Sequence, residues 1–169
     1  MLPGASERFI PIPEGNLGSW ETLKRMAAFI RQPDALVDET VARMTRAGWP
    51  PARVFRWVQD HVLYYPDFNN GVGIEELYTP GYLLMEIARL GATIGDCDDM
   101  TDLLGAIWTR QGYPVTLEGI SRHTDRLLDH VYLYLDGPEG RIAADAIVPH
   151  PLGWEVPAQE VTNRVEMPV

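Results

Sequence analysis

Residues 95–112, GDCDDMTDLLGAIWTRQG, decide the fold class, because they place the only cysteine of the chain at the start of a helix. Apolar residues recur there at intervals of three and four, which predicts a helix from Asp96 to Gln111. Asp96 suits the N-cap position, and Gly112 suits the end of the helix. The stretch therefore predicts a helix that packs in the core and carries Cys97 in its first turn.

The spacing of apolar residues differs between the sequence before this helix and the sequence after it. Upstream, helices are predicted at 20–31 with Ser19 as N-cap, at 34–48, at 52–62 and at 80–90, with an irregular loop at 63–79 and a linker at 91–95. Downstream, a period of two predicts strands at 115–120, 131–135 and 141–148, the last two as a hairpin. Helices followed by strands indicate an α+β fold, in which N-terminal helices and the cysteine-bearing helix pack on a small antiparallel sheet. We expect residues 1–50 to form the N-terminal lead-in and helices, and residues 51–169 to form the core of one compact unit.

The composition narrows the class of partner. The formal net charge is -10, and so acidic a surface repels nucleic acid and anionic lipid, so we expect neither as a partner. No apolar run approaches the roughly 20 residues of a membrane helix, and the first residues lack a signal pattern. A single cysteine cannot form an intrachain disulfide, so a reducing compartment is the simpler expectation. The sequence therefore predicts a cytoplasmic protein with no membrane partner.

Cys97 has the position of a reactive thiol. Free backbone N–H groups and the positive end of the helix dipole gather at a helix N-terminus, and both favour a thiolate. Positions 97, 101, 104 and 108 share one side of the predicted helix, so we expect the sulfur to face the protein body. The neighbouring Asp96, Asp98 and Asp99 disfavour a thiolate, so a cationic histidine is needed beside it. The alternative is a cysteine that acts only as a small buried hydrophobe.

Four histidines compete for the role of general base. His61 lies on the apolar side of a predicted helix, His123 in a polar loop and His150 between two prolines. His130 opens the alternating strand HVYLYL, on the face that also carries two tyrosines. A histidine at a strand end, on the polar face, is well placed to meet a helix N-terminus. We therefore predict His130 as the base.

Asp145 is the predicted third member of the site. It interrupts the apolar run IAADAIV at 142–148, where a carboxylate is disfavoured and needs a partner. If Leu135 lies opposite Gly140, His130 lies directly opposite Asp145 on the same face, with Cβ atoms about 5 Å apart. A slip of one residue would put the two on opposite faces. The alternative is that Asp145 only ends the strand and caps a turn.

Together these residues predict nucleophilic catalysis by cysteine. His130 takes the thiol proton, Cys97 attacks a carbonyl carbon and forms a thioester, and Asp145 orients the imidazole. The backbone N–H of Cys97 is the first expected oxyanion donor. Tyr78 is the candidate for the second donor, followed by Trp57, although simple packing would explain both aromatic side chains equally well. No cofactor is expected.

The order of these motifs resembles the transglutaminase-like superfamily. Gly95–Asp99 with Leu103–Leu104 resembles its nucleophile motif, His130–Tyr132 its histidine strand and Asp145 its aspartate, while Arg56–Val58, Tyr65 and Leu77–Pro80 resemble the segments that usually precede the motif. The likeness covers roughly residues 51–148, with spacings of 33 and 15 residues between the three motifs. The acidic Asp–Cys–Asp–Asp version also resembles small members encoded by tailed phages or prophages.

The resemblance implies a papain-like fold and chemistry at amide bonds of a peptide or protein: proteolysis, deamidation, amidase action or amine cross-linking. The sequence departs from the family pattern at Ala143–Ala146, which lacks the expected tryptophan and following proline. Two alternatives stay open. One is a catalytically silent module that binds a peptide or a partner protein. The other is a divalent metal site at Asp96, Asp98, Asp99 and the histidines, but His-x-x-x-His and Cys-x-x-Cys spacings are absent, so no metal is predicted.

Overall fold

The computed structural model describes residues 10–11, 16–65, 74–75, 77–125, 127–138, 140–147 and 149–169. Its helices are α1 (Asn16–Arg31), α2 (Ala35–Arg46), α3 (Pro51–His61), α4 (Pro80–Leu90), α5 (Cys97–Arg110) and the short 3₁₀ helix η1 (Ala158–Glu160). Its strands are β1 (Ile10–Pro11), β2 (Val62–Tyr64), β3 (Ile74–Glu75), β4 (Thr93–Gly95), β5 (Val115–Ser121), β6 (His130–Gly137), β7 (Gly140–Ala144) and β8 (Asn163–Pro168). The predicted α+β class, with helices and a small antiparallel sheet, is confirmed at this level.

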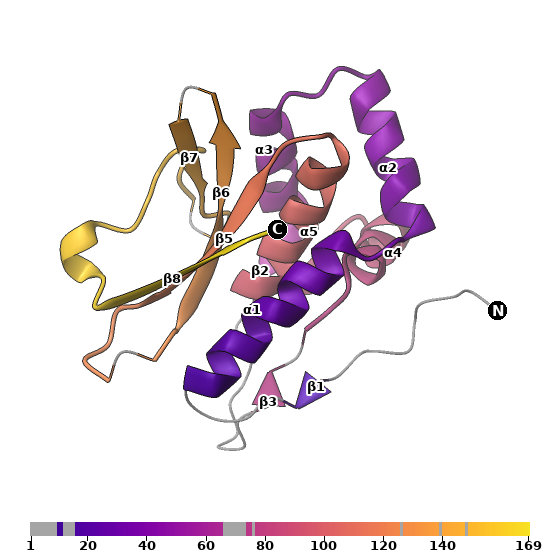
Figure 1. Ribbon diagram of the computed structural model, residues 1–169. Coiled ribbons are helices and arrows are strands. Elements are labelled where there is room, and N and C mark those ends of the chain that lie inside the picture. Colours follow the sequence, from indigo (N-terminus) through magenta and orange to yellow (C-terminus); the bar gives the residue numbers. More distant parts are fainter. Residues whose placement is uncertain are drawn as a thin grey trace.

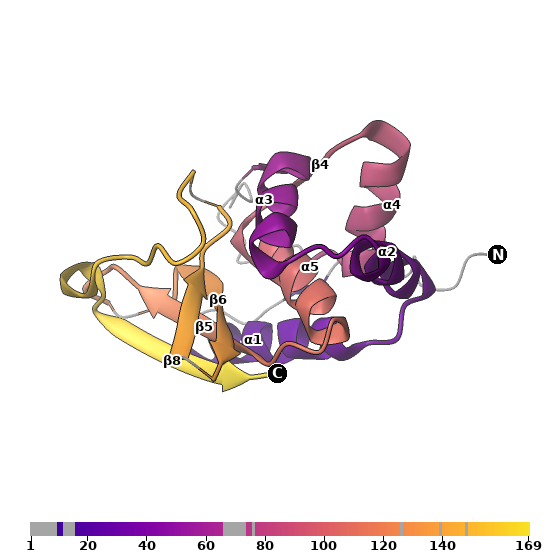
Figure 2. The same cartoon turned by 90° about the horizontal axis from the view of Figure 1, so that it is seen from above.

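Strands β5–β8 form the main sheet, in the antiparallel order β7-β6-β5-β8. Figures 1 and 2 show helices α1–α5 gathered on one side of this sheet. Two pairs of short strands lie outside it: β1 pairs with β3, and β2 pairs in parallel with β4. Among the described helices, none is long and apolar enough to cross a membrane.

Helix α5 is the central element of the fold (Figure 1). It packs against α1, α3, α4 and β6, and every residue from Asp98 to Trp108 is buried. The apolar period predicted one buried face, but the helix is covered all round, as in the core of a larger protein. Burial on every side explains Gly105, since a Cβ there would lie 2.8 Å from the Ile30 side chain of α1.

Several predicted boundaries agree with the structure, and others are wrong. Asp34 caps α2 by accepting hydrogen bonds from two backbone N–H groups at 2.9 and 3.1 Å, as expected. The first helix begins at Asn16 rather than Trp20, so Ser19 lies inside it and is not its N-cap. Residues 62–64 and 93–95, predicted as helix end, loop and linker, form the β2–β4 pair. This pairing joins segments about 30 residues apart, which local sequence signals do not reveal.

The hairpin of β6 and β7 has a different register from the predicted one. Gly137 pairs with Gly140, so Leu135 lies opposite Ile142 and not opposite Gly140. β7 also ends at Ala144, one residue before Asp145. The prediction that Asp145 lies within the strand, directly opposite His130, is therefore wrong, because β6 continues two residues further than assumed, to Gly137, before the turn. The shift of two residues preserves the faces, since side chains alternate with a period of two.

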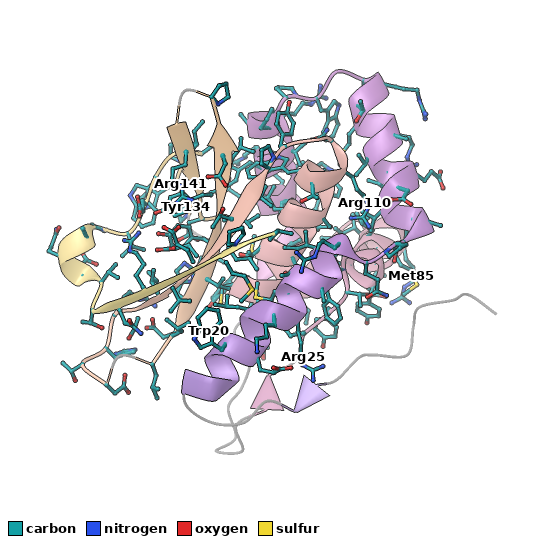
Figure 3. The ribbon with its side chains drawn as sticks, in the orientation of Figure 1. Trp20, Arg25, Met85, Arg110, Tyr134 and Arg141 are labelled. Carbon is teal, nitrogen blue, oxygen red and sulfur yellow. The ribbon has the colours of Figure 1, made fainter. Side chains whose placement is uncertain are left out.

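Arg110 joins the C-terminal ends of α5 and α1 (Figure 3). Its guanidinium donates to the carbonyl of Ile30 at 2.9 Å, to that of Ala106 at 3.1 Å and to that of Gln32. It also pairs with the Asp38 carboxylate at 2.7 Å. The last carbonyls of a helix lack partners within the helix, so one side chain here satisfies several acceptors at once.

We expect Arg110→Met to lower the free energy of unfolding by about 2–3 kcal/mol, because it leaves these carbonyls without their charged donor. Arg56→Met is the matched control, since Arg56 makes an exposed ion pair with Asp60 at 3.1 Å and such pairs contribute about 0–1 kcal/mol. Urea unfolding of both variants checks the difference. Equal losses in the two variants would contradict the structural role of Arg110.

Candidate active site

Cys97 is the first residue of α5, and a capping box holds this turn in place. Asp96 accepts a hydrogen bond from the Asp98 backbone N–H at 3.2 Å, and its own N–H donates to Asp99 at 3.3 Å. The other Asp99 oxygen accepts from the backbone N–H of Tyr78 at 2.9 Å. Asp96 is thus the N-cap that the sequence predicted. Cys97 itself is half-buried and packs against the main core.

His130 and Asp145 form a buried pair. Nε2 of His130 lies 2.7 Å from Oδ2 of Asp145, and the side chains are only 3% and 1% exposed. Continuing the register of β6 and β7 past Ala144 would place Asp145 opposite Tyr132, diagonal to His130, which is within reach of these side chains. An ionised carboxylate only accepts hydrogen bonds, so Nε2 carries the hydrogen and Nδ1 is the nitrogen that can exchange a proton with another group.

One hydrogen bond aligns the start of α5 with the start of β6. The hydroxyl of Thr101, one turn beyond Cys97 on the same helical side, donates to the backbone carbonyl of Val131 at 3.3 Å. Val131 directly follows His130, and Thr101 is buried. The predicted helical side of positions 97, 101, 104 and 108 therefore does face β6, and the N-terminal turn of α5 lies alongside the strand end that carries the histidine.

Tyr64 is a residue of this region that the sequence did not single out. In the β2–β4 pair it lies opposite Gly95, and the Tyr65 N–H donates to the Gly95 carbonyl at 2.9 Å. Partial burial raises the pKa of Tyr64, and the nearby Cys97 and Asp96 raise it further, against the effect of Arg122. The short apolar run Val62–Tyr65 was the available strand signal, and the assignment of this stretch to helix end and irregular loop hid it.

The two predicted oxyanion candidates have other contacts. Trp57 packs partly against the main core and stacks on His61 of the same helix, with ring centroids 4.6 Å apart. The Tyr78 ring stacks on the Tyr82 ring with centroids 5.2 Å apart, and the Tyr78 backbone N–H donates a hydrogen bond to the Asp99 carboxylate. Packing accounts for these aromatic side chains, and their predicted role in an oxyanion hole stays a prediction.

The other histidines lie in different surroundings. Nδ1 of the His61 ring donates a hydrogen bond to the Trp57 carbonyl at 2.8 Å, within α3. His123 is exposed and lies 3.0 Å from Asp129, and His150 stacks on Trp154 with centroids 4.3 Å apart. Of the four histidines, His130 is the one that pairs with a buried carboxylate.

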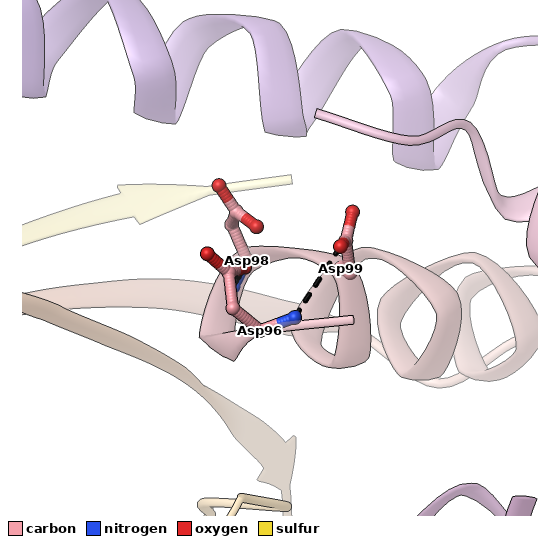
Figure 4. Close-up of side chains that lie close together, drawn as sticks. All are labelled: Asp96, Asp98 and Asp99. Atoms are coloured by element: carbon pink, nitrogen blue, oxygen red, sulfur yellow. Dashed lines mark hydrogen bonds between the residues drawn. The ribbon is translucent and has the colours of Figure 1, made fainter. Parts of the chain in front are cut away.

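Four buried aspartates surround the start of α5. One oxygen each from Asp96, Asp98 and Asp99 lies within 4.8 Å of the others, as Figure 4 shows, and Asp102 follows one turn later. Hard cations such as Ca²⁺ and Mg²⁺ prefer this kind of oxygen group. No histidine belongs to the group, so the mixed aspartate–histidine metal alternative does not match the described residues.

Asp98 and Asp102 lie four residues apart on one side of α5, and both are buried. They are 1% and 0% exposed, because α5 is also covered on the side where its polar residues indicate contact with solvent. Their carboxylate oxygens have no hydrogen-bond donor among the described residues. Burial raises the pKa of Asp98 well above its ordinary value, and the adjacent carboxyl group of Asp96 raises it further. Burial, then Asp99 and Asp96, raise the pKa of Asp102 in the same direction.

We expect Asp102→Asn to stabilise the protein near pH 8 by roughly 2–4 °C in melting temperature. The folded-state pKa of Asp102 is raised. Its stabilising contribution is therefore fully present below about pH 4 and is lost as the pH rises through the folded pKa. The amide removes this loss, so the wild type and the variant should converge at acidic pH.

Glu39→Gln is the control for Asp102→Asn, since its carboxylate is 67% exposed. We expect this control to melt like the wild type at every pH. Thermal melts from pH 4 to pH 8 check both variants. A lower melting temperature for Asp102→Asn at pH 8 would show that the carboxylate is ionised and held by a partner.

Comparisons with protein-family models, with curated proteins and with solved structures found no match to this chain.

Proposed function

We propose that this chain catalyses cysteine-dependent acyl transfer or hydrolysis at amide bonds of a peptide or protein, on the papain-like core of the transglutaminase-like superfamily. The roles in the proposal are Cys97 as nucleophile, His130 as base and Asp145 as the group that orients the base. The sequence motifs suggest this assignment, and the arrangement of α5, β6 and the end of β7 is compatible with it.

The observation that carries the proposal is the buried His130–Asp145 pair, with 2.7 Å between Nε2 and Oδ2. A carboxylate that accepts from one imidazole nitrogen selects the tautomer and stabilises the imidazolium. The Thr101–Val131 hydrogen bond brings the strand end that carries His130 alongside the N-terminal turn of α5. A helix-start thiol, a histidine and a buried carboxylate in sequence are the parts that thiol catalysis needs.

In the proposed reaction, Nδ1 of His130 takes the Cys97 proton and the sulfur attacks the carbonyl carbon of the substrate amide. The tetrahedral intermediate collapses, the C–N bond breaks, and the imidazolium returns its proton to the leaving amine. Water or a second amine then attacks the thioester, with His130 again acting as base. Water gives a carboxylic acid, an amine gives a new amide, and both restore the thiol.

The oxyanion would be held by the Cys97 backbone N–H and by a hydroxyl donor. Tyr64 is the better candidate for this donor than Tyr78 or Trp57, because the β2–β4 pairing places it opposite Gly95, two residues from Cys97. A raised tyrosine pKa keeps the hydroxyl protonated, as an oxyanion donor must be.

The acidic residues around Cys97 are less of an obstacle to a thiolate than the sequence suggested. Burial raises the pKa of Asp98, adjacent to the cysteine, and so favours its neutral form, which adds no negative charge beside the sulfur. The Asp96 and Asp99 carboxylates accept hydrogen bonds from backbone N–H groups of the capping box and of Tyr78. The dipoles of these N–H groups offset part of the carboxylate charge.

The rate of Cys97 alkylation by iodoacetamide, followed by intact mass between pH 5 and pH 9, tests the proposal. We expect the wild type to react well below the pH at which an ordinary thiol, of pKa about 8.5, ionises. His130→Ala should slow alkylation about tenfold or more at pH 6.5, and Asp145→Asn should lie between the two. His123→Ala, an exposed histidine, should match the wild type. If the wild type labels at the rate and with the pH profile of an ordinary thiol, the proposal fails.

A catalytically silent peptide-binding module is the second candidate, and one observation favours it. Three apolar side chains of the β2–β4 pair are exposed close to the start of α5: Leu63 at 57%, Tyr64 at 49% and Ile94 at 56%. Exposed apolar groups on a short strand pair suit an extended peptide. Ordinary thiol behaviour in all variants of the alkylation test would select this candidate.

A further inference from the structure

A cluster of polar side chains lies on the face of the main sheet that carries His130. One oxygen of Glu155, Oε1, accepts hydrogen bonds from the Tyr132 hydroxyl at 3.0 Å, from the Tyr134 hydroxyl and from the Arg164 guanidinium at 2.9 Å. Arg141 covers the Tyr134 ring, with its guanidinium carbon 4.5 Å from the ring centroid (Figure 3). Two strands and the segment between β7 and β8 therefore meet at one carboxylate.

Glu155 belongs to the segment that starts with Asp145. Its described residues, 145–147 and 149–162, lie between β7 and β8 and cross the face of the sheet opposite the helices (Figure 2). Val156, Trp154 and Val161 from this part of the chain pack with Ile120, Tyr132, Tyr134 and Ala143 in a second, small core. The backbone is tied to β7 by a hydrogen bond from the Gly153 N–H to the Ala143 carbonyl at 2.8 Å.

Glu155 is held as an anion in this position. Burial acts to raise its pKa, but the hydrogen bonds from Tyr134, Arg164 and Tyr132 outweigh burial, and the net pKa is lowered. Hydrogen bonds to an ionised group are about twice as strong as neutral ones. Arg164 also lies 2.9 Å from Glu118, but burial raises the pKa of Glu118 to about 7, so near neutral pH that carboxyl group is partly protonated. The positive charge of Arg164 is therefore largely available to Glu155.

The cluster adjoins the His130–Asp145 pair through Tyr132. The rings of His130 and Tyr132 are tilted against each other with centroids 5.8 Å apart, and Asp145 continues the register of β7 toward Tyr132. Asp145 itself lies beyond the last ladder pair of β7, so strand hydrogen bonds do not fix its backbone. The position of its carboxylate depends on how the following segment is held.

We propose that Glu155 is a positioning residue, whose carboxylate fastens the segment from Asp145 to Pro157 onto Tyr132, Tyr134 and Arg164 and so keeps the Asp145 carboxylate on His130. Glu155 acts through Asp145 and does not touch the reacting atoms. The proposal names a positioning residue for the proposed cysteine chemistry and rests on that function. The contact between His130 and Asp145 can nevertheless be measured without any catalysis.

The Nε2–H proton of His130 provides that measurement, because a proton held between imidazole and carboxylate gives a downfield resonance in proton NMR spectra and exchanges slowly with water. We expect Glu155→Gln to speed this exchange by about fivefold or more, since the amide cannot accept three donors on one anionic oxygen. Asp145→Asn removes the acceptor itself and gives the exchange rate expected when the His130–Asp145 contact is fully lost. Glu160→Gln replaces an exposed glutamate of η1, just beyond Pro157, and should exchange like the wild type.

Tyr134→Phe is a second, milder variant that tests the same cluster if Glu155→Gln does not fold. It removes one donor but keeps the ring under Arg141, and we expect a smaller increase in exchange in the same direction. The alkylation profile of Glu155→Gln should move toward that of Asp145→Asn while circular dichroism is unchanged. Wild-type exchange in a folded Glu155→Gln would overturn the proposal, and so would a wild type without the downfield resonance.

The two proposals can fail separately. Ordinary thiol behaviour of wild-type Cys97, together with faster exchange in Glu155→Gln, would remove the catalytic function and keep the positioning role. A reactive Cys97 together with unchanged exchange in Glu155→Gln would keep the catalytic function and remove the positioning role.

Discussion

Burial of α5 on every side is the constraint on which the rest of the structure depends. Between Cys97 and Trp108, Cys97 is the one residue of the helix that is not fully buried. The capping box at its start and Arg110 at its end fix both termini against neighbouring segments. The helix can therefore neither rotate nor shift without breaking these contacts. The direction of the Cys97 side chain is set by the packing of the whole helix and not by local flexibility.

This arrangement has an electrostatic cost. Asp98 and Asp102 are enclosed without a donor from any described residue, and a buried carboxylate of this kind is expensive in its ionised form. A core that packed for stability alone would place apolar side chains at these two positions. Features that lower stability in this way tend to gather at functional sites. Their position within five residues of Cys97 agrees with a functional constraint on this turn.

The opposite face of the sheet shows a different solution to the same problem. There the partly exposed Glu155 accepts hydrogen bonds from three donors, and Asp145 faces the imidazole of His130. Both carboxylates thus have the hydrogen bonds that Asp98 and Asp102 lack. The strand β6 connects the two regions, because its alternate side chains face the helices and the segment between β7 and β8 in turn. One strand therefore relates the start of α5 to the anchored segment.

Local signals determined much of this protein from the sequence alone. The helix after Asp96, its cap, the Asp34 cap and the strand that opens at His130 depend on residues a few positions apart, and each is as predicted. The need of Asp145 for a buried partner was also readable, because a carboxylate within an apolar run is costly. Tertiary structure decided the rest: the two-residue shift of the hairpin, the β2–β4 pair that brings Tyr64 opposite Gly95, and the cover over Asp98 and Asp102. These features depend on which distant segments pack together, and that choice lies in the summed burial of the whole chain and not in any short stretch of it.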